Sequence, residues 1–202
     1  MSERFKGLVK LPKEPAAKLL SQANILIKTP LLAPASAAPE QVLTELESKK
    51  AWFDLLLVMA VLLPPRERVW WACLAARDYI GPKSPADPQP LTASEAWVFK
   101  PTDENRDVAR HSLDNAYVDD DTTNCANAVV YSDGTLGPGD LAQYPAPAGA
   151  AELHAYAMNM VALNMLSDKF DAQIQLMIDR AVDIARGGNG HVKPAKELEG
   201  EV

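Results

Sequence analysis

Two prolines, Pro64 and Pro65, interrupt the most apolar part of the chain and divide it into the runs 52–63 and 66–80. Proline lacks a backbone N–H and disfavours helical geometry in the residue before it, so a helix over 52–63 must end at this pair. The fixed φ of proline also suits a first helical turn, so the same pair can open the helix over 66–80. The first run is apolar on nearly every side. The pattern predicts a tight helical hairpin, residues 51–80, at the centre of the fold.

The rest of the chain also reads as helices separated by proline. Alternation of β-branched and aromatic residues is not sustained anywhere, whereas Ala, Leu, Met and Glu dominate the periodic stretches. Besides the hairpin, the predicted helices are 13–27, 41–49, 92–99, 103–117, 122–132, 151–166 and 169–186. Pro39 is expected in the first turn of the second of these, and the predicted N-caps are Thr92 or Ser94 for the third and Thr102 for the fourth. Gly187 and Gly188 are expected to end the last. The expected fold class is all-α: a multi-helix bundle of antiparallel helical hairpins with proline-rich connectors at 29–39 and 82–90.

The domain organisation follows from length and periodicity. A chain of 202 residues favours one domain. We therefore expect a single helical domain over 1–188, with a possible sub-division at the irregular segment 133–150. Residues 189–202 are polar and aperiodic, and we expect a disordered C-terminal tail there.

Charge and cysteine content restrict the partners and the compartment. The net charge of −7 argues against a nucleic-acid partner, because phosphate contacts need a basic stripe. The apolar run 55–63 is too short to cross a bilayer, so no membrane insertion is expected. Two isolated cysteines, Cys73 and Cys125, without an apolar signal core suggest a reducing compartment. We expect a cytoplasmic protein.

The corner that opens the second apolar helix is the first candidate site. Trp70 and Trp71 point about 100° apart on a helix, so both cannot face one narrow core stripe. Either other helices surround this one, or one indole is displayed as an interface anchor. Beside them, Arg66 and Arg68 either grip a partner carboxylate or form an internal salt bridge or cap. The predicted protein-binding residues here are Pro65, Arg66, Arg68, Trp70 and Trp71.

The glycine-rich segment 132–150 is the second candidate surface. It matches neither a phosphate-binding loop nor a dinucleotide fingerprint, and it reads as a long surface connector. Irregular stretches of this length are uncommon unless they have a role. Gly134 and Leu136 are its predicted protein-binding residues.

Three other groups of residues support chemistry only weakly. His111 with Asp107 and Asp114 could form an acid–base pair, but no Ser or Cys nucleophile stands in a recognisable motif. His154 and Met158 share a helix face, with Met165 on the same helix, yet Met at helical spacing usually fills a core. The acidic run at Asp119 lacks the glycine and the distant glutamate of a calcium loop. No catalytic residue, metal or cofactor is expected.

Several of these segments resemble a family of uncharacterised bacterial proteins, a domain of unknown function. The hallmark is Pro65-Arg66-Glu67-x-Val69-Trp70-Trp71-Ala72-Cys73, and the resemblance continues through the segments 96–97, 101–106, 131–138 and 183–188. The chain departs from the pattern at Arg68, where a small residue is expected, and at Tyr131, where Trp is more usual. The family has no established activity, so no catalytic residue carries over. Its association with type VI secretion genes implies an accessory or adaptor protein.

The expected function is a non-enzymatic helical adaptor or scaffold that binds a protein partner, as an accessory to a bacterial secretion system. Two alternatives stay open: an enzyme that uses an unrecognised His/Asp site, and a helical bundle that binds a small molecule or a metal. The oligomeric state does not follow from the sequence.

Overall fold

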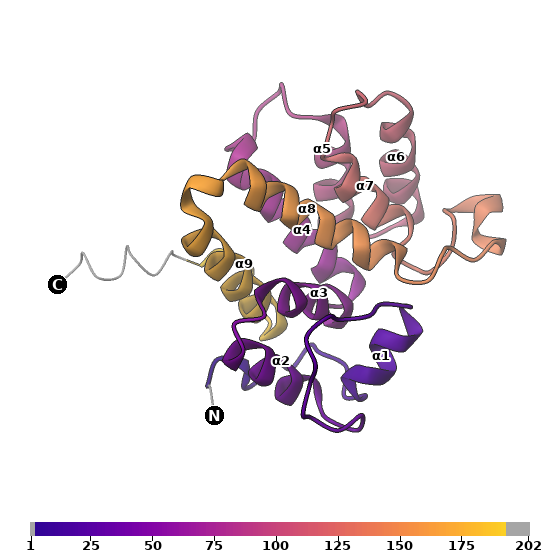
Figure 1. Ribbon diagram of the computed structural model, residues 1–202. Coiled ribbons are helices and arrows are strands. Elements are labelled where there is room, and N and C mark those ends of the chain that lie inside the picture. The colour runs from indigo at the N-terminus through magenta and orange to yellow at the C-terminus, as the bar shows by residue number, and fades with distance from the viewer. Residues whose placement is uncertain (1–2, 193–202) are drawn as a thin grey trace. The chain divides into compact units, whose positions relative to one another are not determined.

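The computed structural model describes residues 3–192, and within that range the chain forms nine α-helices, three short 3₁₀ helices and no strand (Figure 1). The predicted all-α class is confirmed. A single isolated antiparallel bridge, between Thr135 and Pro145, is the nearest approach to sheet structure in the described residues. Most of the predicted tail, 189–202, lies outside the described residues.

The described helices fall into two compact units, which we treat separately. The first unit comprises the described parts of Met1–Leu63 and Leu166–Val202, and the second is Pro64–Met165. The first unit contains η1 (Glu3–Phe5), α1 (Ala16–Gln22), α2 (Pro39–Ser48), α3 (Trp52–Leu62), η3 (Ser167–Lys169) and α9 (Phe170–Ala185). The second contains α4 (Pro65–Ile80), α5 (Gln89–Phe99), α6 (Asp103–Asp114), α7 (Thr123–Val130), η2 (Gly139–Gln143) and α8 (Ala150–Met165). Whether the two units make one domain stays a prediction.

The two helices of the predicted hairpin over 51–80 are assigned to different units. The division falls between Leu63 and Pro64, so α3 belongs to the first unit and α4 to the second. Within the first unit α3 packs against α1, α2 and α9, and within the second α4 packs against α5, α7 and α8. A helix that is apolar all round needs neighbours on every side. Each half of the 51–80 segment therefore packs against several helices of its own unit.

Helix boundaries follow the predicted signals where a proline, a cap or a glycine fixes them. Pro39 and Pro65 each occupy the first turn of their helices, and the Thr102 hydroxyl accepts a hydrogen bond from the Asn105 backbone N–H at 3.3 Å. The predicted cap at Thr92 or Ser94 is wrong, because α5 begins at Gln89. Both hydroxyls instead donate to carbonyls four residues earlier within the helix.

The first helix is shorter than predicted. Periodicity suggested 13–27, but α1 ends at Gln22. Asn24 adopts a left-handed conformation with φ of 52°, and the Ile25 backbone N–H returns to the Leu20 carbonyl at 2.9 Å. The chain therefore turns at Asn24, and residues 25–35 continue as an extended connector instead of a helix.

Long-range polar contacts fasten the N-terminal segment of the first unit. The Arg4 guanidinium donates to Asp179 and Gln175 of α9 and to Glu47 of α2. In return, Arg186 donates to the backbone carbonyls of Arg4 and Lys6. These contacts close the first unit around α3 from both ends of the chain.

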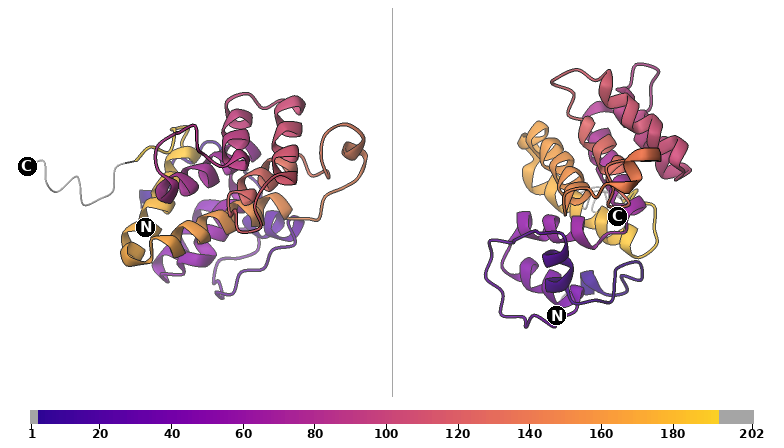
Figure 2. Two further views of the ribbon diagram at one scale, coloured as in Figure 1. Left: turned by 90° about the horizontal axis from the view of Figure 1, so that it is seen from above. Right: turned by 90° about the vertical axis from the view of Figure 1, so that its right-hand side faces the viewer.

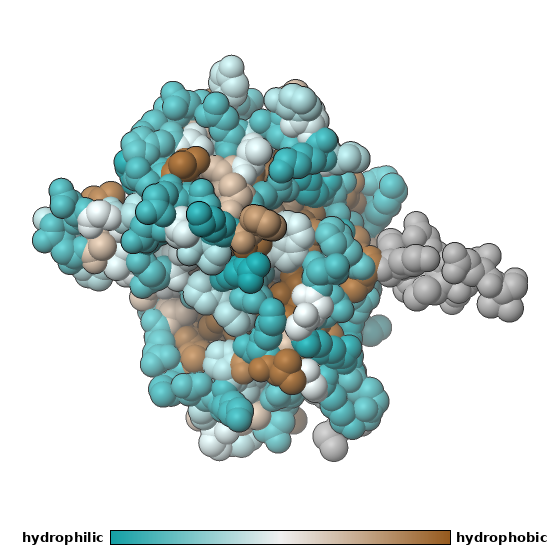
Figure 3. All heavy atoms as spheres, turned by 180° about the vertical axis from the view of Figure 1, so that it is seen from behind, coloured by the Kyte–Doolittle hydropathy of each residue, from teal (hydrophilic) through white to brown (hydrophobic). Residues whose placement is uncertain are grey.

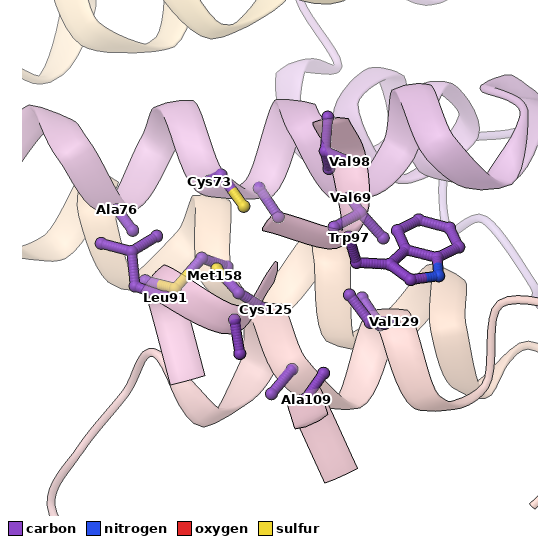
Figure 4. Close-up of a cluster of buried hydrophobic side chains, with 14 of the residues drawn as sticks. Val69, Cys73, Ala76, Leu91, Trp97, Val98, Ala109, Cys125, Val129 and Met158 are labelled. Atoms are coloured by element: carbon purple, nitrogen blue, oxygen red, sulfur yellow. The ribbon is translucent and has the colours of Figure 1, made fainter. Parts of the chain in front are cut away.

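The second unit is built around the short helix α7, which packs against α4, α5, α6 and α8. Small residues allow this close packing, and Ala126 and Ala128 of α7 are fully buried. Figure 4 shows the resulting core, in which Cys73 of α4, Cys125 of α7 and Met158 of α8 lie in one group of side chains. Both cysteines are free thiols and fully buried.

Both units expose some large apolar side chains, among them Phe53 and Phe170, whose ring centroids lie 6.2 Å apart. Figure 3 shows brown residues as separate spots among teal ones on the face it displays. Isolated exposed apolar residues are ordinary for a folded protein. Among the residues that the structure describes, no helix is long and apolar enough to cross a membrane.

Candidate functional site

The corner at the start of α4 is engaged with its own unit. Pro65 and Arg66 are exposed, but the Arg66 Nε donates to the Val98 carbonyl at the end of α5, 2.7 Å away. Arg68 is only 6% exposed, and its guanidinium lies 2.9 Å from the Glu152 carboxylate of α8. Burial lowers the pKa of Arg68, and the charge of Glu152 opposes that shift. Both arginines therefore hold helices of the second unit together.

The two tryptophans are also packed inside. Trp71 is fully buried, and Trp70 is partly buried against the core of the second unit. Of the two arrangements open from the sequence, the structure has the one in which neighbours surround the helix. Trp71 is not displayed at a surface.

The predicted loop is an ordered projection, which we call the arm (residues 132–149). It stands clear of the helices of the second unit in Figure 1, where it is the orange segment, and again in the left view of Figure 2. Its two sides are paired: the Leu136 N–H donates to the Tyr144 carbonyl, and the Ala146 N–H donates to the Gly134 carbonyl, both at 2.9 Å. With the bridge between Thr135 and Pro145, this pairing makes a short antiparallel ribbon closed by η2.

A buried arginine anchors the base of the arm. Arg106 of α6 is buried, and its guanidinium donates to the Val130 carbonyl, the Asp133 carboxylate and the Thr135 hydroxyl. Partial burial alone would raise the pKa of Asp133, but hydrogen bonds from Thr135 and Arg106 hold that pKa below its ordinary value. The anchor joins two of the segments on which the family resemblance rests, 101–106 and 131–138.

Two glycines make the fold of the arm possible. Gly134 has a φ of 81°, which other residues rarely adopt. At Gly137, a Cβ atom would lie 3.0 Å from Leu141 Cδ1 and 3.5 Å from Arg110 Cδ, so a side chain would displace the packing there. The arm therefore requires glycine at Gly134 for its backbone conformation and at Gly137 for the close approach of Leu141 and Arg110.

Leu136 and Tyr144 form the exposed apolar face of the arm. Residues directly opposite each other in an antiparallel pair project to the same side, and the ribbon places Leu136 opposite Tyr144. Leu136 is 37% exposed and Tyr144 is 52% exposed. At the left edge of Figure 3, the projecting arm carries brown and tan residues among teal ones.

The histidines lie in two different settings. The His111 side chain is 57% exposed on α6, and its Nδ1 is 3.2 Å from the Asp107 carboxylate one turn earlier. The Nδ1 of His154 is 3.0 Å from the Asn124 side-chain oxygen, and its ring stacks on Tyr131 with centroids 5.9 Å apart. Burial lowers the pKa of His154. His111 therefore lies on a solvated helix face, and His154 lies in a contact between helices.

Metal-ligating groups do not gather in the described part of the chain. No set of three or more His, Cys, Asp or Glu side chains that could hold a metal ion is found between residues 3 and 192. Met158 is fully buried in the core, whereas Met165 is exposed at the end of α8. In the acidic run, the Asp120 carboxylate accepts hydrogen bonds from the Thr122 N–H and hydroxyl, and so orders the turn before α7.

Sequence reasoning missed Arg106 as the residue that organises the second candidate surface. The available signal was its place on α6: Arg106, Ala109 and Leu113 share one helix face, and the last two are apolar. A charged side chain on a buried face needs internal partners. Those partners come from a segment more than twenty positions away, which helix periodicity does not reveal.

Comparisons with known proteins place the chain in a family. No curated protein and no solved structure matches it. A family of unknown function matches residues 42–185, and the match runs from within α2 to the end of α9. Since this is well over half of the chain, the protein belongs to that family of unknown function, DUF6931.

Proposed function

We propose that the protein is a non-enzymatic helical adaptor that binds a protein partner through the arm. The observation that carries the proposal is the combination of a fixed base and an exposed apolar tip. Buried Arg106 orders the arm, while Leu136 and Tyr144 stay accessible on one face. A side-chain pair that is already ordered loses little conformational entropy on binding.

The chemistry of the arm indicates the partner. Residues 132–149 include the acidic side chains Asp133 and Asp140 but no Lys or Arg. We therefore propose a partner protein with an apolar groove bordered by basic residues, into which Leu136 and Tyr144 insert. Charge complementarity of this kind speeds encounter and selects between partners. The same acidic character, with a net charge of −7, supports a protein rather than a nucleic acid as partner.

The cellular setting is part of the same proposal. The free thiols of Cys73 and Cys125 support a reducing compartment, and we place the adaptor in the bacterial cytoplasm. The family resemblance supports a role as an accessory of a type VI secretion system. The corner residues Pro65 and Arg66 remain exposed and could border the interface, whereas Arg68, Trp70 and Trp71 support the fold.

The test compares two matched double variants in a native host. Leu136→Ser with Tyr144→Ser removes the apolar face of the arm. Val108→Ser with Tyr117→Ser removes similar exposed side chains from outside the arm. A partner that co-purifies with the wild-type protein is then purified, and its affinity for all three proteins is measured by calorimetry.

We expect the arm variant to bind the purified partner about tenfold or more weakly than the wild type, as for loss of interface anchors worth more than about 1 kcal/mol each. The control variant should bind like the wild type. Equal affinity of the arm variant and the wild type, or equal loss in both variants, would overturn the proposal.

A further inference from the structure

The first unit contains a cavity of about 420 Å³ between α1 and the extended connector that follows it. This volume lies within the range of roughly 300–1,000 Å³ that is typical of small-molecule sites. Its lining comes from α1, from the connector 24–35 and from one residue of α2: Ala16, Ala17, Leu20, Ser21, Asn24, Ile25, Leu26, Ile27, Thr29, Leu31, Ala33, Pro34, Ala35 and Val42.

The connector wall is fixed by side chains behind it. The Asp54 carboxylate of α3 accepts hydrogen bonds from the Lys28 and Thr29 backbone N–H groups at 3.1 and 2.7 Å. The Glu45 carboxylate of α2 accepts from the Leu32 and Ala33 backbone N–H groups at 2.6 and 2.8 Å. These bonds hold an extended chain away from α1, so the cavity does not depend on a ligand for its shape.

Lysine and glutamate strengthen the same wall. The Lys49 Nζ donates to the Pro30 carbonyl at 2.5 Å and to the Glu45 carboxylate at 2.6 Å. The charges of this pair are directed to the connector backbone and to each other. Neither residue lines the cavity.

The chemistry of the lining defines the ligand. Its floor is aliphatic and buried, formed by Ala16, Leu20, Ile25 and Val42. The lining includes no aromatic and no charged side chain, and its polar side chains are Ser21, Asn24 and Thr29. The cavity is partly open to solvent, and a charged group that reached its buried floor would lose water without gaining a counter-ion. An alkyl chain would gain free energy from apolar burial, and one neutral polar group could reach the hydroxyls or the amide.

We propose that this cavity binds a neutral aliphatic molecule with one hydroxyl or amide group, such as a medium-chain alcohol or fatty amide. The alkyl part lies against the floor, and the polar group meets Ser21, Asn24 or Thr29. This site belongs to the first unit and is independent of the arm, which belongs to the second.

The experiment uses the full-length protein and three probes with the same chain: 1-octanol, octanoate and octylammonium. Calorimetric titration at neutral pH is expected to show saturable binding of 1-octanol at one site. The two charged probes should bind about tenfold or more weakly, because each must leave its charge partly desolvated.

Two variants, each with one alanine replaced by tryptophan, locate the site. Ala17→Trp places an indole where an exposed α1 residue lines the cavity. Ala172→Trp is the matched control, because Ala172 is an exposed helical alanine of the same unit, on α9, and lies outside the lining. Thermal unfolding shows whether each variant is folded. A folded Ala17→Trp variant should lose 1-octanol binding, whereas Ala172→Trp should keep it.

Three results would overturn the inference: no saturable binding of 1-octanol, equal binding of octanoate and 1-octanol, or equal binding by the two tryptophan variants. If Ala17→Trp fails to fold, Ala35→Trp on the connector wall takes its place, with the same control. None of these results bears on the arm, since the arm variants leave this cavity unchanged.

Discussion

Arg68 shows how one side chain can be mistaken for part of a binding surface. Its place beside two tryptophans in a hallmark motif suggested an interface, yet the guanidinium is buried against Glu152. Burying a charge is tolerated only when a partner compensates for the lost hydration. The Glu152 carboxylate of α8 explains how the chain accommodates a charged side chain at this buried position.

Removing Glu152 should therefore destabilise the protein. We expect Glu152→Gln to lower the free energy of unfolding by about 1–3 kcal/mol, because the Arg68 charge would remain buried beside a neutral amide. Denaturant unfolding measures the change. The double variant Arg68→Met with Glu152→Met should recover most of the loss, and a double variant less stable than Glu152→Gln would contradict this account.

The cysteine pair makes a second prediction at the residue scale. Hydrogen bonding to Cys125 and burial raise the pKa of the Cys73 thiol well above its ordinary value, so Cys73 is a poor nucleophile in the folded protein. We expect neither thiol to react with Ellman's reagent until the protein unfolds. Both should react in denaturant. Ala142→Cys, at an exposed position of the arm, is the control that should react at once, and rapid reaction of the wild type would refute the prediction.

At the scale of elements, irregular segments are held by carboxylates and an arginine rather than by regular hydrogen bonding. Asp54 and Glu45 fix the connector in the first unit, and Arg106 fixes the arm in the second. Backbone N–H and C=O groups need hydrogen-bond partners, and in a segment without helix or sheet structure side chains can supply them. This explains how a chain with 16 prolines keeps defined connectors.

Replacing the anchor of the arm should release it. Lysine keeps the charge of Arg106 but lacks the planar fork that reaches Val130, Asp133 and Thr135 together. We expect Arg106→Lys to speed proteolytic cleavage within 132–149 while the helices stay protected. Mass spectrometry of the fragments locates the cuts. An unchanged cleavage rate in that segment would show that Arg106 does not control the arm.

Glu45 should make the connector sensitive to acid. Hydrogen bonds from Lys49 and from the Leu32 and Ala33 backbone lower its pKa from 4.5 to about 2. The folded protein therefore binds fewer protons than the unfolded chain between these values. The stabilisation by Glu45 is present above pH 4.5 and is lost as the pH falls towards 2.

The acid sensitivity of the Glu45 contact is tested by comparing the thermal unfolding of the wild type with that of Glu45→Gln. The wild type should have the higher Tm at pH 7, and the difference should shrink as the pH falls from about 4.5 to about 2.5. Lys49→Met removes the largest cause of the lowered pKa, so this variant should lose less stability than the wild type as the pH falls from about 4.5 to about 2.5. A difference in Tm that stays constant with pH would rule out this role for Glu45.

At the scale of the whole molecule, sequence reasoning succeeded where the cause of a structure is local. Pro39, Pro65, Thr102 and Gly187 act on their own helices, and the structure has helix ends at each of them. The all-α class follows from the same local patterns.

The sequence could not show what depends on distant partners. Which helices pack against α3 and which against α4 depends on residues far away in the sequence. From the sequence alone, Arg68 and Arg106 cannot be distinguished from exposed arginines, because their partners Glu152 and Asp133 are distant in the chain. The cavity likewise needs Asp54 and Glu45 to hold a connector that periodicity assigned in part to a helix.

The discontinuous first unit has a consequence for how the protein is made. Arg4 pairs with Asp179, 175 positions later, and α3 packs against α9. Synthesis runs from the N-terminus, so the whole of Pro64–Met165 leaves the ribosome before α9 does. α1 and α2 are made before α3 and can pack against it at once, whereas the α9 face of α3 is covered only after the whole second unit has been synthesised.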